Sequence, residues 1–96
     1  MSNAIITFEI MPTSPDVDLE PIKEKALEIA RNQGAKGNME SKIEPVAFGL
    51  QKIIIMGMYE MSDDKDFDKI TAEMKTIEGV QEAEIAKMDL AMGWFE

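Results

Sequence analysis

The sequence predicts an α+β fold, a ferredoxin-like βαββαβ sandwich in which a four-stranded antiparallel sheet carries two helices on one face. Two segments have apolar residues at helical spacing, and each lies between segments of strand-like pattern. Right-handed strand–helix–strand crossovers then place both helices on the same side of the sheet. A chain of 96 residues suits one such domain. We therefore expect residues 1–96 to form a single domain.

The first strand is predicted at residues 5–11, where strand-like alternation puts three large apolar residues on one face: Ile6, Phe8 and Ile10. Pro12 and Pro15 follow, and proline ends a strand because it lacks an amide donor. Residues 1–4 have the composition of an expression scar or an unordered start. We assign no function to them.

The first helix is predicted from Leu19 to Gln33. Asp16 or Asp18 offers an N-cap, because a short carboxylate accepts from the free amides of the first turn. Pro21 is tolerated near the helix start, and Gly34 is a suitable stop. The apolar stripe of this helix consists of Leu19, Ile22, Ala26, Leu27, Ile29 and Ala30.

Two strands joined by a short connection are predicted next, after a loop at residues 35–38. Met39–Val46 is a modest strand, and Pro45 indicates that it lies at an edge of the sheet. Leu50–Tyr59 is apolar on both faces in its middle, which favours a central position. The segment between them, Ala47-Phe48-Gly49, is expected to form a hairpin connection.

The second half of the sequence repeats the helix–strand order. Residues 60–68 form an acidic connection. A second helical stripe consists of Phe67, Ile70, Met74 and Ile77, and Gly79 is expected to end that helix. A last strand follows at Val80–Leu90, and residues 92–96 form a short tail.

Composition excludes several function classes. Cysteine and histidine are both absent, which removes disulfides, thiol nucleophiles and histidine-based metal sites or general bases. The net charge of −9 opposes binding to phosphate backbones. No stretch approaches the ~20 apolar residues of a membrane span, and no signal sequence opens the chain. We expect a cytoplasmic protein with neither nucleic acid nor membrane as a direct partner.

Known ligand motifs are missing as well. The acidic run that includes Asp63, Asp64, Asp66 and Asp68 lacks the glycine and the glutamate that a calcium loop needs at its sixth and twelfth positions. No glycine-rich phosphate loop occurs. We therefore expect no metal and no cofactor. No nucleophile–base pair is suggestively spaced, so we do not expect an enzyme.

Aromatic residues and methionines are two further kinds of candidate binding group. Phe8 and Tyr59 are the only aromatic residues in the predicted strands, too few beside so acidic a surface for RNA recognition. Methionine fills small cores as well as adaptable surfaces. We place Met56, Met58 and Met74 in the core.

Phe48 is the remaining candidate, a large apolar residue beside Gly49 at a hairpin tip. Two readings stay open from the residues alone. The ring is either a buried loop aromatic or an anchor that enters a pocket of a partner protein.

Two segments resemble the archaeal translation elongation factor 1-beta family. Residues 11–19, Met-Pro-Thr-Ser-Pro-Asp-Val-Asp-Leu, are similar to its first strand-to-helix junction, and residues 45–50, Pro-Val-Ala-Phe-Gly-Leu, to its second hairpin. Residues 77–81 fit its approach to the last strand. The resemblance covers about residues 3–90.

The resemblance implies a guanine nucleotide exchange factor whose partner is the GTPase elongation factor 1-alpha. It implies partner contacts at Ala47, Phe48 and Gly49. Eukaryotic relatives also use a lysine near the C-terminus, which aligns here with Leu90, while Lys87 lies three residues earlier. A three-residue shift changes both face and reach, so Lys87 does not simply replace that lysine.

A second hypothesis is a ferredoxin-like module that binds a small molecule or a second copy through its free sheet face. A stable homodimer and a buried Phe48 would favour it. On the exchange-factor hypothesis the chain is a monomer or associates weakly.

Overall fold

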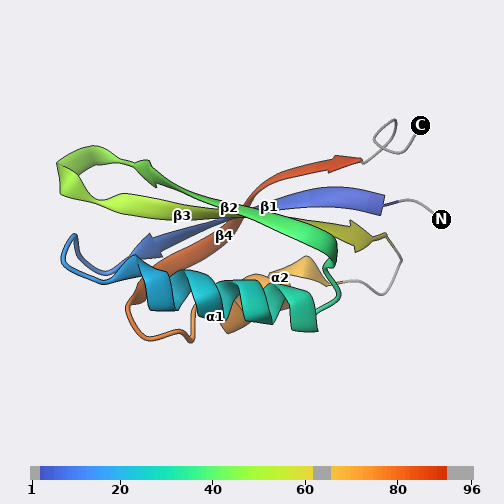
Figure 1. The fold of residues 1–96 in the computed structure, drawn as a ribbon, viewed down its shortest axis with the longest axis horizontal. Coiled ribbons are helices and arrows are strands. Elements are labelled where there is room, and N and C mark those ends of the chain that lie inside the picture. The colour runs from blue at the N-terminus through green and yellow to red at the C-terminus, as the bar shows by residue number, and fades with distance from the viewer. Residues whose placement is uncertain (1–2, 62–65, 91–96) are drawn as a thin grey trace.

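The structure is a computed structural model that describes residues 3–61 and 66–90. Its elements follow the predicted order and form one sheet with two helices below it (Figure 1). Their bounds are β1 (Asn3–Pro12), α1 (Leu19–Asn32), β2 (Lys36–Pro45), β3 (Gln51–Glu60), α2 (Phe67–Met74) and β4 (Val80–Leu90). The sheet order is β2-β3-β1-β4, and every neighbouring pair is antiparallel. This confirms the ferredoxin-like fold.

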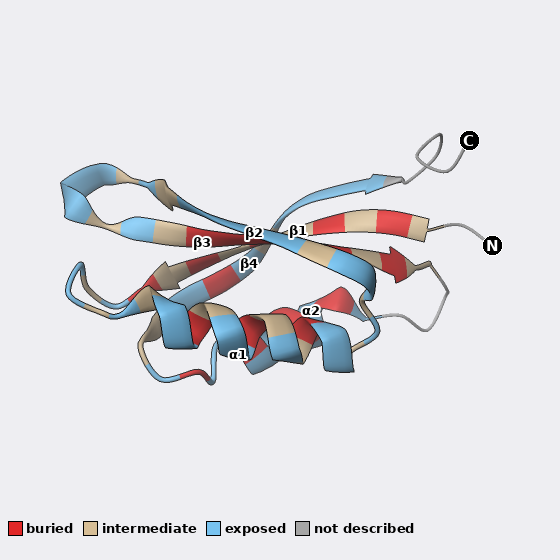
Figure 2. Cartoon of the chain, in the orientation of Figure 1, coloured by how far each residue is buried: buried red, intermediate tan, exposed pale blue. Residues whose placement is uncertain are grey.

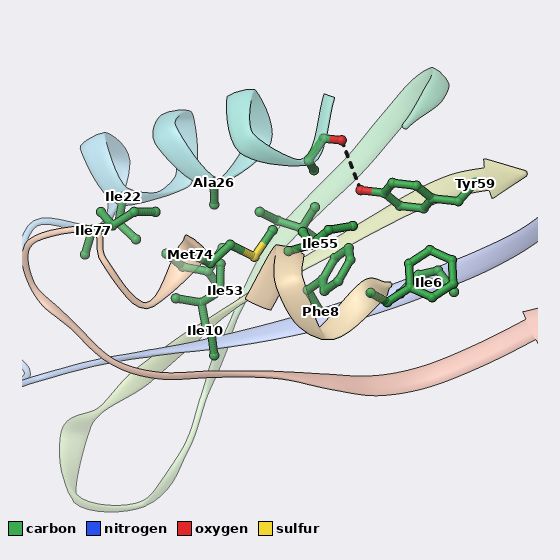
Figure 3. Packing of buried hydrophobic residues seen from close by; sticks show 14 of the residues in the cluster. Ile6, Phe8, Ile10, Ile22, Ala26, Ile53, Ile55, Tyr59, Met74 and Ile77 are labelled. Atoms are coloured by element: carbon green, nitrogen blue, oxygen red, sulfur yellow. Dashed lines mark hydrogen bonds between the residues drawn. The ribbon is translucent and has the colours of Figure 1, made fainter. Parts of the chain in front are cut away.

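The core lies between the sheet and the helices, and strand alternation produces it. Every second residue of β1 is buried, beginning with Ala4 (Figure 2). Tyr59 is fully buried, and its hydroxyl donates to the carbonyl oxygen of Ala30 at 3.1 Å (Figure 3). Its ring also makes edge-to-face contacts with Phe8 and Phe67. Burial raises the pKa of the Tyr59 phenol above its usual value.

Both helices begin at an aspartate cap. Asp18 accepts a hydrogen bond from the amide of Glu20, so of the two predicted caps Asp18 is the one used. Asp66 does the same for Asp68 and Lys69 at the start of α2. The helix α1 ends at Asn32, one residue before the predicted end.

Two predicted boundaries are wrong by three residues or more. The strand β2 begins at Lys36 rather than Met39, because Lys36 pairs with Met58 of β3. The register shifts between Lys36 and Glu40, and Gly37 adopts a left-handed conformation within this irregular stretch. The helix α2 ends at Met74 rather than near Gly79. Ile77 is still buried, because a turn whose Ile77 amide donates to the Met74 carbonyl carries it onto the core.

Part of the methionine prediction is also wrong. Met74 is fully buried, as predicted, but Met56 and Met58 are only half-buried. They lie on the face of β3 that points away from the helices, because Ile53, Ile55 and Tyr59 occupy the core positions of the same strand. Strand alternation, and not hydrophobicity alone, decides which face each methionine takes.

The edge position of β2 is confirmed, and Pro45 is its last residue. The strand β3 is central, as predicted. The strand β1 begins at Asn3 and Ala4 is fully buried, so the unordered start expected for residues 1–4 is wrong for these two residues. The expectations placed on residues 1–2, on the acidic positions 62–65 and on the tail at residues 92–96 lie outside the described residues.

Candidate functional site

The candidate site is the tip of the β2–β3 hairpin, at the left of Figure 1. The amide of Val46 donates to the Leu50 carbonyl at 2.8 Å and closes the hairpin. Between them Ala47–Gly49 form a tight turn, in which the Leu50 amide donates to the Ala47 carbonyl at 3.3 Å. This turn places Phe48 at the outermost point of the hairpin.

The backbone of the turn is unusual at Phe48. Its φ of 63° and ψ of 30° are left-handed, and Gly49 follows with a φ of 77°. Within residues 3–61 and 66–90, Phe48 is the one non-glycine residue with a positive φ. A β-carbon in this region costs about 1–2 kcal/mol, because it approaches the following carbonyl oxygen. Glycine would avoid that cost, so the fold itself does not require phenylalanine here.

The side chain of Phe48 gains nothing from the fold either. It is 94% exposed, and it lies outside the hydrophobic core cluster. The reading in which Phe48 is a buried loop aromatic is therefore wrong. An apolar ring held in water on a strained backbone is destabilising for the isolated chain, and such residues occur where a partner or ligand is bound.

Ion pairs brace the legs of the hairpin behind the tip. The Lys42 ammonium lies 2.9 Å from the Glu44 carboxylate on β2, and hydrogen bonding from Lys42 lowers the pKa of Glu44. The Lys52 ammonium on β3 lies 3.2 Å from a carboxylate oxygen of Glu9 on β1. The exposed Lys42–Glu44 pair adds little stability, whereas the part-buried Lys52–Glu9 pair links β3 to β1.

Lys87 lies on β4 opposite Thr7 of β1. Its side chain is 69% exposed, and its ammonium is 3.6 Å from the Asp89 carboxylate. Leu90 ends β4, and its backbone pairs with Ala4. Both belong to the C-terminal part of β4, and that end of the strand lies at the right of Figure 1, at the other end of the sheet from the hairpin tip.

The structure therefore does not bring the candidates together. Through their partners on β1, Lys87 is level with Met56 of β3, and Leu90 is level with Tyr59. At about 3.3 Å per strand residue, they lie roughly 17 and 26 Å along the sheet from Gln51, where the hairpin tip joins β3. If all these residues touch one partner, they touch two separate regions of it.

A shallow cleft lies beside the ends of β1 and α2, and sequence reasoning missed it. Its volume is about 490 Å³, and it is lined by Thr13, Val17, Asp18, Pro21, Ile22, Lys25, Glu78 and Gly79. The amide of Thr13 donates to the Gly79 carbonyl at 2.9 Å, which ties its two walls together. No local pattern could have shown it, because the walls are more than fifty residues apart in the sequence.

Other ligand chemistry finds no support in the part of the chain that the structure describes. No group of three or more potential metal ligands occurs there. Phe8 and Tyr59 are fully buried and do not face water, so neither ring is free to stack on a base. Among the described residues, no helix is long and apolar enough to span a membrane.

Comparison with known proteins agrees with the sequence resemblance. The family described as EF-1 guanine nucleotide exchange domain matches residues 5–90. Elongation factor 1-beta of Methanococcus maripaludis is 36% identical over 91 residues, covering 94% of this chain and 99% of the relative. Elongation factor 1-beta proteins of Archaeoglobus fulgidus and Methanosphaerula palustris are 35% and 34% identical, with the same coverage. The chain therefore belongs to the elongation factor 1-beta family and carries its guanine nucleotide exchange domain.

Proposed function

We propose that this chain promotes exchange of GDP for GTP on elongation factor 1-alpha by inserting the ring of Phe48 into a pocket of that GTPase. Membership of the exchange-factor family supports the activity. The observation that carries the residue assignment is the 94% exposed ring on a left-handed backbone. Ala47 and Gly49 serve the contact by forming the turn that presents the ring.

The proposed mechanism needs no catalytic residue on this chain. A protein that weakens GDP binding must itself be bound more weakly when GDP is present, because coupling between two ligands is reciprocal. A tenfold loss of GDP affinity requires about 1.4 kcal/mol of difference between the contacts made with the empty and the GDP-bound GTPase. GTP then rebinds from its larger pool, so the chain changes the rate of exchange and not the nucleotide equilibrium.

The rigidity of the hairpin suits this role. A turn closed by two backbone hydrogen bonds, between strands paired in the sheet, sets the backbone position from which Phe48 projects. Little backbone freedom is then lost on association, so more of the contact energy remains for distorting the partner.

Lys87 and Leu90 are proposed as a second contact at the far end of the sheet. Lys87 must leave Asp89 to reach a partner, and an exposed ion pair of 3.6 Å costs little to break. Its contribution is expected to be modest. We further propose that the chain acts as a monomer in the cytoplasm, because a net charge of −9 opposes self-association.

The test is release of a fluorescent GDP analogue from elongation factor 1-alpha. Stoichiometric wild-type chain should accelerate release, and Phe48→Ala should lose most of the acceleration. Met88→Ala is the matched control, because Met88 is also an exposed apolar residue, 47% exposed, but lies on β4. Equal acceleration by Phe48→Ala and wild type would remove Phe48 from the site. No acceleration by wild type would reject the function.

A further inference from the structure

The face of the sheet that points away from the helices carries a central strip of three apolar side chains and one threonine. Met58 lies opposite Ile5, and Met56 lies opposite Thr7, in adjacent rows of β3 and β1. All four are half-buried, and none belongs to the core cluster or packs against it. No helix or strand among the described residues covers this strip, which we call the open-face strip.

The margins of the open-face strip are negative. Each lysine on this face has a carboxylate within 4 Å: Lys36 with Glu60, Lys42 with Glu44, Lys52 with Glu9, and Lys87 with Asp89. Glu40, beside Met56, and Glu84, beside Glu9, form no ion pair with any described residue. The carboxylates around the strip that form no ion pair within the described ranges therefore lie on both edge strands.

This pattern argues against a second copy as the occupant. Two copies placed face to face would bring the acidic margins together, and each copy carries a net charge of −9. Like charges in contact are costly and slow the encounter. An apolar centre with acidic margins instead complements an apolar patch surrounded by Lys and Arg.

We propose that the open-face strip binds such a basic-rimmed apolar patch on the same GTPase, so that the contact continues from the hairpin tip along the sheet. This rests on the proposed function, because it adds a surface to that complex. The hairpin that carries Phe48 is formed by β2 and β3, and the strip begins a few residues behind the tip on β3. A partner that holds Phe48 and also approaches Lys87 would lie over this face.

The test compares a double substitution on the strip with a matched control elsewhere. Met56→Gln with Met58→Gln replaces apolar tips by polar ones of similar length on the open face. Met88→Gln makes the same change on the other face, because Met88 pairs with Ile6 of the core side. Titration calorimetry with nucleotide-free elongation factor 1-alpha should give about a tenfold higher Kd for the double variant and no change for Met88→Gln.

The salt dependence of binding tests the role of the acidic margins. Raising the salt concentration should weaken the wild-type complex, and Glu40→Gln with Glu84→Gln should make that dependence shallower. An unchanged salt dependence in this variant would contradict the basic-rimmed partner.

The outcomes separate this proposal from the proposed function. If wild type binds and Phe48→Ala weakens binding, while Met56→Gln with Met58→Gln does not, only the open-face proposal fails. A wild-type homodimer that the methionine substitutions dissociate would assign the strip to a second copy and overturn it. A clear loss of thermal stability in the methionine variant would also overturn it, because the strip would then pack within the chain.

Discussion

Replacing Phe48 by glycine should change folding and binding in opposite directions. The ring is 94% exposed, so its removal takes nothing from the core. Glycine adopts a φ of 63° without the steric cost of about 1–2 kcal/mol that a β-carbon incurs there. Part of this gain is offset, because glycine makes the unfolded chain more flexible. The net expectation is a fold that is equally stable or up to about 1 kcal/mol more stable.

Binding to elongation factor 1-alpha should fall sharply in the same variant. Full burial of a phenylalanine side chain contributes about 1.5–3 kcal/mol, which corresponds to roughly a 10- to 150-fold change in Kd. Thermal denaturation gives the first quantity, and titration with the nucleotide-free GTPase gives the second. Phe48→Ala removes the ring and keeps the β-carbon, so it should lose affinity without the gain in stability.

Either of two results would refute this reasoning. A drop of several degrees in the Tm of Phe48→Gly would mean that the ring contributes to the fold. An unchanged Kd would mean that the ring of Phe48 has no role in partner binding.

Three further predictions concern the second contact and the fold. Lys87→Ala should leave the Tm unchanged and reduce exchange at most modestly; complete loss of exchange would make Lys87 the principal contact. Tyr59→Phe should cost about 0.5–1.5 kcal/mol of unfolding free energy, because the hydroxyl bond to the Ala30 carbonyl is lost while the Ala35 amide still donates to that carbonyl. Burial raises the pKa of Tyr59 in the fold, so the folded chain holds this proton more tightly than the unfolded chain. Unfolding free energy should therefore fall as pH rises above the ordinary value of 10, and the fall should be smaller in Tyr59→Phe. Gly79→Ala should destabilise the chain by about 1–3 kcal/mol in urea denaturation. The φ of Gly79 is 93°, and the new β-carbon would lie 3.1 Å from Val17 and 3.2 Å from Ile22. An unchanged urea midpoint would contradict the close packing at this turn.

The order of elements followed from local patterns, because alternation and helical stripes record which face is buried. Proline at position 45 lacks an amide donor and so indicated an edge strand, which the sheet order confirms. Membership of the exchange-factor family also followed from short motifs at the correct spacing, and it confirms an exchange factor rather than an enzyme.

The predictions that were wrong concern features that depend on tertiary contacts. The apolar stripe of α2 continues to Ile77, although the helix ends at Met74 and a turn places Ile77 on the core. Met56 and Met58 have the same composition as core residues, and only their register against Thr7 and Ile5 shows that they face away. The sequence around Phe48 likewise does not predict whether its ring is exposed, because that depends on how far the hairpin extends from the core.

The central claim is that this chain binds the empty GTPase more tightly than the GDP-bound one. The most direct measurement is the Kd of the wild-type chain for elongation factor 1-alpha without nucleotide and at saturating GDP. GDP should raise this Kd by the same factor by which the chain lowers the affinity of the GTPase for GDP. Equal Kd values in the two conditions would contradict it, because a ligand that does not distinguish two states cannot shift the balance between them.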